Sequence, residues 1–185
     1  MRYGQGKRGM SIDQLLAAAD EVLEQGEALL TGLSDAQYAQ AATAGGSIGA
    51  HYRHSLEHFK LLFEAAKDNH VDYDRRERDE RLQTERLAAL KATRDFREAA
   101  RFLSTLSPER PIEVRSKISY AAPISYAVPS TLGREIMFAV SHAIHHHALI
   151  AMLCGMRAIP VPGDFGVAPS TLAHHKQQIA ARRFA

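Results

Sequence analysis

The sequence predicts an all-α protein: a four-helix bundle with a long proline-rich crossover before the last long helix. Four stretches carry apolar residues at helical spacing, at about residues 11–32, 47–68, 84–103 and 131–156. Prolines interrupt the segment between the third and fourth stretches, where they forbid a long regular helix. With 185 residues, the chain is long enough for one domain and short for two. We therefore expect a flexible arm over residues 1–10 and a single helical domain over residues 11–185.

The first helix is predicted to begin at Ser11, because Ser11 and Gln14 have the spacing of a capping box. Leucine and alanine then recur at helical spacing, and the helix ends near Gly32. Residues 34–46 are rich in alanine, glycine and small polar residues. They are predicted to form a connection that contains a short helical turn from Asp35 to Gln40.

Ser47 has the position of an N-cap for the second helix, which is predicted to run to about Asp68. The next segment, residues 72–81, alternates in the sign of its charges, which favours a salt-bridged surface over a basic tract. The third helix is predicted from about Thr84 to Leu103.

The crossover at residues 107–130 has β-like alternation at residues 112–114 and 117–120, so we expect at most a small hairpin there. The fourth long helix is predicted to start near Ser130 or Thr131 and to end at about Met156. The tail that follows is rich in proline and glycine and ends in a short basic helix.

The charge and cysteine content exclude several classes of protein. The chain has 23 Lys plus Arg and 21 Asp plus Glu, a net charge of +2, so we expect no nucleic-acid partner. No run of about 18 uninterrupted apolar residues predicts a membrane span, and the basic N-terminus leads into no apolar signal segment. The single cysteine, Cys154, excludes an intrachain disulfide and is predicted to be a small buried apolar residue. A cytoplasmic location is expected.

Ten histidines are the unusual feature, and seven of them fall in two clusters on predicted helices: His51, His54 and His58, then His142, His145, His146 and His147. His142 and His146 are four residues apart, so their rings project from one helix face. One histidine of the second helix, together with this pair, would give three nitrogen ligands and open positions, as in catalytic zinc sites. The alternative is a set of hydrogen-bonded core histidines. His147 is predicted to point to another side, and replacing it should affect neither metal retention nor helix content.

The segments Ser47–Phe59 and Ser141–Ile150 resemble the two histidine motifs of the DinB/YfiT-like superfamily. Residues 72–79 and 164–171 are similar to segments of a compact bacterial branch of it, and the resemblance spans roughly residues 11–172. It implies a four-helix bundle that holds a divalent ion, zinc or nickel, on three histidines. The resemblance implies that the metal ligands are His54, His142 and His146. On the second helix, His51 and His58 are the alternatives to His54.

The resemblance does not fix a reaction. Some relatives use low-molecular-weight thiols, which implies a metal-dependent enzyme, either a thiol-dependent transferase or a hydrolase-like catalyst, acting on a small molecule. The second hypothesis is a non-enzymatic bundle that binds a metal or small ligand. The third is a dimeric interaction module with structural histidines. A homodimer is expected in the first case as well, and no catalytic side chain is assigned.

The sequence allows two interpretations for Glu57 and two for a set of three arginines. Glu57 either orients a ligand or acts as a base, or it is a solvated carboxylate on the helix face. Arg75, Arg76 and Arg78 either hold an anionic cosubstrate or form a salt-bridged turn with the acidic residues beside them.

Overall fold

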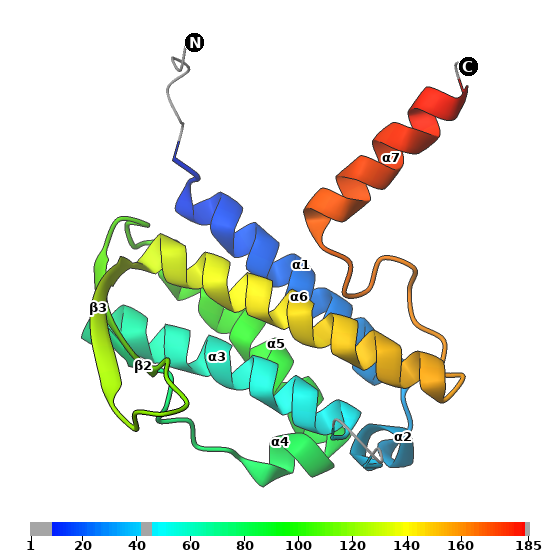
Figure 1. Cartoon of the computed structure of the whole chain (residues 1–185), viewed down its shortest axis with the longest axis horizontal. Helices are drawn as coiled ribbons and strands as arrows, with labels where there is room; N and C mark the ends of the chain where they lie inside the picture. The colour runs from blue at the N-terminus through cyan, green and yellow to red at the C-terminus, as the bar shows by residue number, and fades with distance from the viewer. Residues whose placement is uncertain (1–8, 42–45, 184–185) are drawn as a thin grey trace.

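The computed structural model describes residues 9–41 and 46–183, so most of the predicted N-terminal arm lies outside the described residues. Helices dominate these ranges, as predicted (Figure 1). They are α1 (Ile12–Gly32), α2 (Asp35–Ala39), α3 (Ile48–Asp68), α4 (Glu80–Thr84), α5 (Arg86–Leu103), α6 (Leu132–Met156) and α7 (Pro169–Arg183).

Four long helices form the body of the molecule. Helix α1 packs against α5 and α6, and helix α3 packs against the same two neighbours. Each of the four therefore shares a core with two others, and α3 and α6 run side by side (Figure 1). The largest fully buried side chains come from all four helices and from the segments between them: Leu30, Tyr38, Ile48, Tyr52, Leu56, Phe59, Leu62, Leu103, Ile112, Leu132, Ile136 and Ile150.

The predicted starts of three long helices are confirmed by their caps. Ser11 and Gln14 form a reciprocal capping box at α1. The side chains of Ser47 and Thr131 each accept a backbone hydrogen bond at the starts of α3 and α6. These hydroxyls satisfy backbone N–H groups that have no partner inside the helix, which is why sequence alone located the boundaries.

The β structure is larger than predicted. Strands β2 (Pro111–Lys117) and β3 (Ser125–Thr131) form an antiparallel hairpin in the crossover, and β1 (His70–Asp72) adds to it in parallel. The first predicted β segment, 112–114, lies in β2, whereas the second strand lies at 125–131 and not at 117–120. Strand β1 lies in the loop after α3 and was not predicted. It has only three residues, too few to display an alternating pattern, and it forms because Val71 is buried beside β2.

Two helical segments also differ from prediction. The third long helix begins at Arg86 rather than near Thr84, because the separate short helix α4 precedes it and the chain is extended at Glu85. The tail helix α7 has 15 residues and extends away from the other helices (Figure 1).

One described helix, α6, is long and apolar enough to cross a membrane by length and composition alone. The central helix of a helical core has the same properties. Helix α6 packs on α1 and α3 and carries the second histidine cluster.

Candidate metal centre

Helices α3 and α6 bring together the three histidines that the family resemblance implies as metal ligands. His54 comes from α3, whereas His142 and His146 lie one turn apart on α6. One ring nitrogen from each of the three lies within 4.8 Å of the other two. The Nε2 atoms of His54 and His142 are 3.0 Å apart, and the ring centroid of His146 is 4.6 Å from those of both other residues. These three side chains have the donor set of a divalent-ion site.

The environment keeps the three imidazoles neutral. Burial, reinforced by the other histidines of the cluster, lowers the pKa of His142 to about 4 and that of His146 to about 3. Burial is also the main cause that lowers the pKa of His54, with contributions from His58 and Arg76. A neutral imidazole offers a nitrogen lone pair, the form that binds zinc, nickel and related ions.

His51 and His58, the two alternatives to His54 on α3, border this group. His58 donates a hydrogen bond from Nδ1 to the carbonyl oxygen of His54 at 2.9 Å, and its ring centroid is 4.0 Å from that of His142. The Nδ1 atom of His51 lies 3.1 Å from Nδ1 of His146. The Nδ1 atom of each is therefore engaged at the edge of the group formed by His54, His142 and His146.

Arg76 reaches the cluster from the loop that follows β1. Its Nη1 atom lies 2.7 Å from Nδ1 of His54 and 3.4 Å from Nε2, the nitrogen that faces His142. A guanidinium can only donate, so Nδ1 accepts this hydrogen bond. An arginine at this position also adds a positive charge beside the site.

Two other ambiguous charged residues, Glu57 and Arg75, are ion-paired. Glu57 is buried and binds Arg53 at 3.0 Å, so it is neither a solvated carboxylate nor an unpaired base. Arg75 is 87% exposed and lies 3.6 Å from Asp72, as a salt-bridged turn predicts. Cys154 is fully buried, as expected.

Sequence reasoning did not identify Glu135, a buried carboxylate that is linked to the cluster through Tyr73. Glu135, at the start of α6, accepts hydrogen bonds from the Tyr73 hydroxyl at 2.5 Å and the Ser130 hydroxyl at 2.6 Å. The Tyr73 ring in turn stacks on His58. This network fixes the segment after β1 against α6. No local sequence pattern predicts the Tyr73–Glu135 hydrogen bond, because the two residues are 62 positions apart.

His147 points away from His54, His142 and His146, as predicted, but into another buried region. It is 2% exposed, stacks on Phe165 at 4.5 Å between ring centroids, and has a buried Nδ1 without a hydrogen-bond partner. Gly166 lies directly against α6, where an added Cβ would come within 2.4 Å of the backbone nitrogen of Ala148. The first part of the 164–171 segment, which resembles the compact bacterial branch in sequence, therefore packs against α6 at His147 and Ala148.

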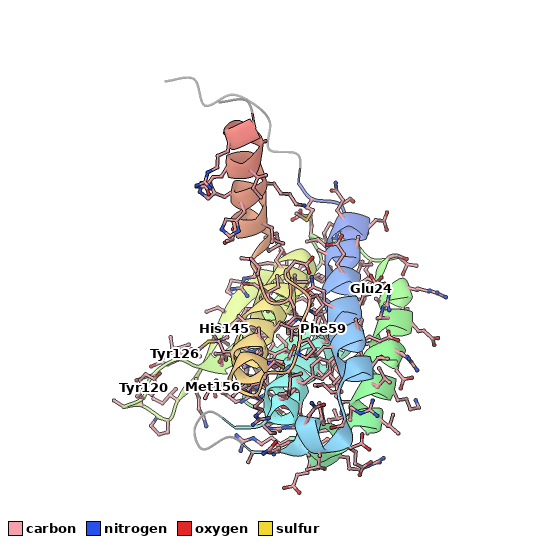
Figure 2. All side chains as sticks on the ribbon, turned by 90° about the vertical axis from the view of Figure 1, so that its right-hand side faces the viewer. Glu24, Phe59, Tyr120, Tyr126, His145 and Met156 are labelled. Atoms are coloured by element: carbon pink, nitrogen blue, oxygen red, sulfur yellow. The ribbon has the colours of Figure 1, made fainter. Side chains whose placement is uncertain are left out.

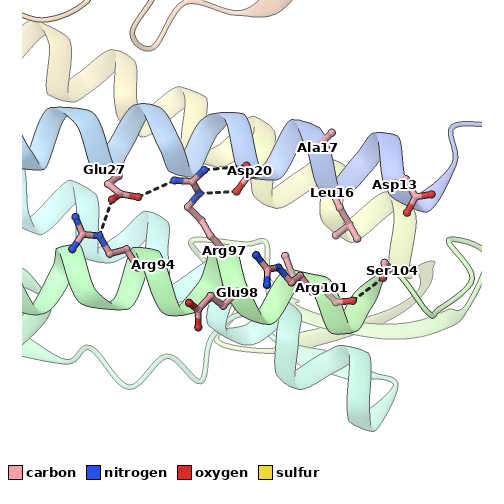
Figure 3. A pocket seen from close by; sticks show the side chains of 11 residues that line it. Asp13, Leu16, Ala17, Asp20, Glu27, Arg94, Arg97, Glu98, Arg101 and Ser104 are labelled. Carbon is pink, nitrogen blue, oxygen red and sulfur yellow. Dashed lines mark hydrogen bonds and ion pairs between the residues drawn. The ribbon is translucent and has the colours of Figure 1, made fainter.

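A groove of about 690 Å³ lies elsewhere, between α1 and α5 (Figure 3). Its central charges satisfy one another, because Arg97 donates to both Asp20 and Glu27 while Arg94 donates to Glu27. These carboxylates have lowered pKa values, chiefly through their hydrogen bonds with Arg97 and Arg94. The groove has the character of a charged helix-helix contact, and the convergence of donor nitrogens makes the histidine cluster the better site candidate.

Comparison with known proteins shows which superfamily the chain belongs to. The fungal protein named FK506-binding protein 5, from Rhizopus delemar, is 33% identical over 108 residues, which is 58% of this chain and 28% of the relative. The chain therefore spans less than a third of that relative, and the name describes the relative as a whole. The family model of the DinB superfamily matches residues 18–150, a range that contains both histidine clusters and the four long helices apart from the ends of α1 and α6. The chain belongs to the DinB superfamily.

Proposed function

We propose that this protein is a metal-dependent enzyme with the four-helix bundle and proline-rich crossover of a DinB-like fold. His54, His142 and His146 hold one divalent ion, zinc or nickel, and the substrate is a small molecule that reacts with a low-molecular-weight thiol. The observation that carries the proposal is the convergence of three imidazole nitrogens within 4.8 Å from two neighbouring helices. Three protein ligands leave coordination positions for substrate, which separates catalytic from structural sites.

A bound divalent ion would lower the pKa of a coordinated thiol or water, which provides a nucleophile at neutral pH. The surrounding residues prepare the site for that role. Because His58 donates from Nδ1 to a backbone carbonyl, its Nε2 is the nitrogen that can accept a proton. The Tyr73–Glu135 hydrogen bond holds the ring that stacks on His58.

The test begins with protein purified without a histidine tag. We expect metal analysis to find about one equivalent of zinc or nickel per chain, and removal by a chelator to be reversible. Metal-loaded protein should then accelerate the reaction of 2-mercaptoethanol with 1-chloro-2,4-dinitrobenzene, in which a C–S bond forms and chloride and the thiol proton are released. Metal-free protein and a His142→Ala variant are the controls. Absence of stoichiometric metal would overturn the proposal.

The alternative is a non-enzymatic bundle that binds a metal or small ligand. One observation favours it: the carboxylate nearest in sequence to the α3 histidines, Glu57, is committed to Arg53 and is not available as a base. Stoichiometric metal and thiol binding without any acceleration over the metal-free control would support this alternative.

We also propose that two copies of the chain associate. Helix α6 carries exposed apolar side chains along its outer face, namely Met137, Met152 and Met156, and Figure 2 shows Met156 at the surface. A symmetric dimer is the simplest closed assembly that covers such a face. Light scattering at micromolar concentration should give twice the mass of the chain, and a monomer mass would contradict the proposal.

A further inference from the structure

We propose that Arg76 is the anion-binding group of the histidine site and that the ligand is a small thiol or other nucleophile that carries a carboxylate. The ligand would place its nucleophilic atom at the ion and its carboxylate on the Arg76 guanidinium. This inference rests on the proposed metal site and extends it to the class of ligand.

The first observation is that Arg76 lacks the carboxylate partner that its neighbours have. Arg53 pairs with Glu57, Lys60 with Glu77 and Arg75 with Asp72, whereas within the described residues Arg76 has no carboxylate within 4.0 Å. Its polar contacts are to the ring nitrogens of His54, and its Nε is buried without a hydrogen-bond partner. A partly buried guanidinium in this condition retains capacity for an anionic ligand.

The second observation is the charge at the site. Three neutral imidazoles leave the two positive charges of a divalent ion uncompensated, and Arg76 adds a third. The two buried carboxylates of the surrounding helices are already committed: Glu57 to Arg53, and Glu135 to Tyr73, Ser130 and Arg134. An anionic ligand is therefore favoured over a neutral one of the same size.

The third observation concerns the two nitrogens of His54. Its Nε2 faces His142, and the Nη1 atom of Arg76 lies 2.7 Å from its Nδ1, which accepts the hydrogen bond, and 3.4 Å from its Nε2. When Nε2 binds an ion, the proton of the neutral ring resides on Nδ1, which then cannot accept a hydrogen bond. Arg76 must leave His54, and its donors become available at a place where one small molecule can contact both the guanidinium and the ion.

A carboxylate fits this group better than other anions. The planar fork of a guanidinium matches the two oxygens of a carboxylate in a bidentate pair. One arginine supplies one positive charge, which suits a monoanionic head group.

The experiment compares two thiols that differ in the carboxylate, mercaptoacetate and 2-mercaptoethanol, on cobalt-loaded protein. Cobalt(II) reports thiolate binding through a sulfur-to-cobalt absorption band, and the thiol proton is released to solvent. We expect mercaptoacetate to bind at least about tenfold more tightly than 2-mercaptoethanol. In Arg76→Gln this preference should fall to within about twofold, while the cobalt stoichiometry and the affinity for 2-mercaptoethanol are retained. Arg76→Lys should give an intermediate preference, because it keeps the charge and loses the fork.

Arg75→Gln is the matched control, since Arg75 is adjacent in sequence but exposed and paired with Asp72. It should keep the full preference. The inference is overturned if the native protein binds cobalt and both thiols equally, or if Arg76→Gln retains the preference. Failure to bind cobalt at all would instead overturn the proposed metal site, so the two failures are distinguishable.

Discussion

The Nε2 atoms of His54 and His142 lie 3.0 Å apart, although the two residues are 88 positions apart in the sequence. A tetrahedral ion with nitrogen ligands at about 2.1 Å holds those ligands about 3.4 Å from one another. The two rings therefore need to separate by only a few tenths of an ångström to share an ion. Helices α3 and α6 therefore hold the two rings close to the separation that a shared ion would need.

Replacing His142 or His146 with Ala should abolish metal retention and leave helix content nearly unchanged. Two of three protein ligands cannot hold the ion firmly, whereas the apolar core around the site is untouched. Metal analysis after gel filtration, together with circular dichroism, measures both quantities. His174→Ala, an exposed histidine on α7, is the control and should keep full stoichiometry. Full metal retention in His142→Ala would contradict the assignment.

Replacing His51 or His58 tests the register of the site on α3. We expect both Ala variants to keep stoichiometric metal with at most a modest loss of affinity, because these residues border the group and are not part of it. His54→Ala should lose the metal. If His51→Ala or His58→Ala loses it while His54→Ala does not, the ligand on α3 lies one helical turn away.

The metal-free protein should lose stability as the pH falls from about 6.5 toward 4. Burial lowers the pKa of His142 and His147 to about 4 and that of His146 to about 3, from 6.5 in an unfolded chain. Between these values the unfolded chain binds more protons, so the free energy of unfolding decreases with decreasing pH. The slope is about 1.4 kcal/mol per pH unit for each extra proton. Urea titrations at pH 7.5, 6.0 and 5.0 measure it.

Two controls accompany this pH prediction. Stability should be level between about pH 7 and 8, where His142, His146 and His147 are neutral in both states. The ion-paired carboxylates Asp20 and Glu27 have lowered pKa values, so the unfolded chain takes up their protons at a higher pH than the folded protein does. They add a loss of the same sign only near the acid end of this window, so the change between pH 7.5 and 6.0 reports the histidines. A midpoint that stays constant from pH 7.5 to 5.0 would show that the histidines are less buried than the structure indicates.

The features that sequence reasoning located are those with a local signature. Ser11 and Ser47 mark helix starts because a cap acts within three residues. The pairing of His142 with His146 follows from helical spacing, and the choice of His54 followed from the family resemblance. Strand β1, the Tyr73–Glu135 hydrogen bond and the approach of Arg76 to His54 depend on segments that are distant in sequence. Such contacts leave no periodic pattern and emerge only when the chain is folded.

His147→Ala should lower the free energy of unfolding by about 2–4 kcal/mol, because it removes a buried ring and leaves a cavity. The sequence suggested no effect on the fold, since the ring points away from the ligands. The stack on Phe165 changes that expectation. His147→Phe keeps the ring and removes the unpartnered Nδ1, so it should cost less than about 1 kcal/mol. Chemical denaturation of metal-free protein tests both variants, and a smaller loss in Ala than in Phe would contradict this account.

Gly166→Ala should destabilise the protein by more than about 2 kcal/mol, from two causes that act together. Gly166 has a φ of +73°, a left-handed conformation that is strained for alanine. An added Cβ would also lie 2.4 Å from the backbone nitrogen of Ala148 and 2.6 Å from the carbonyl carbon of His147, and a helix backbone cannot yield. The segment would lift from α6 and carry Phe165 off His147. Gly163→Ala, where an added Cβ meets nothing within 4 Å, is the matched control and should stay within about 0.5 kcal/mol of the native protein. Equal effects of the two variants in urea denaturation would show that the 164–166 segment does not seat on α6 in solution.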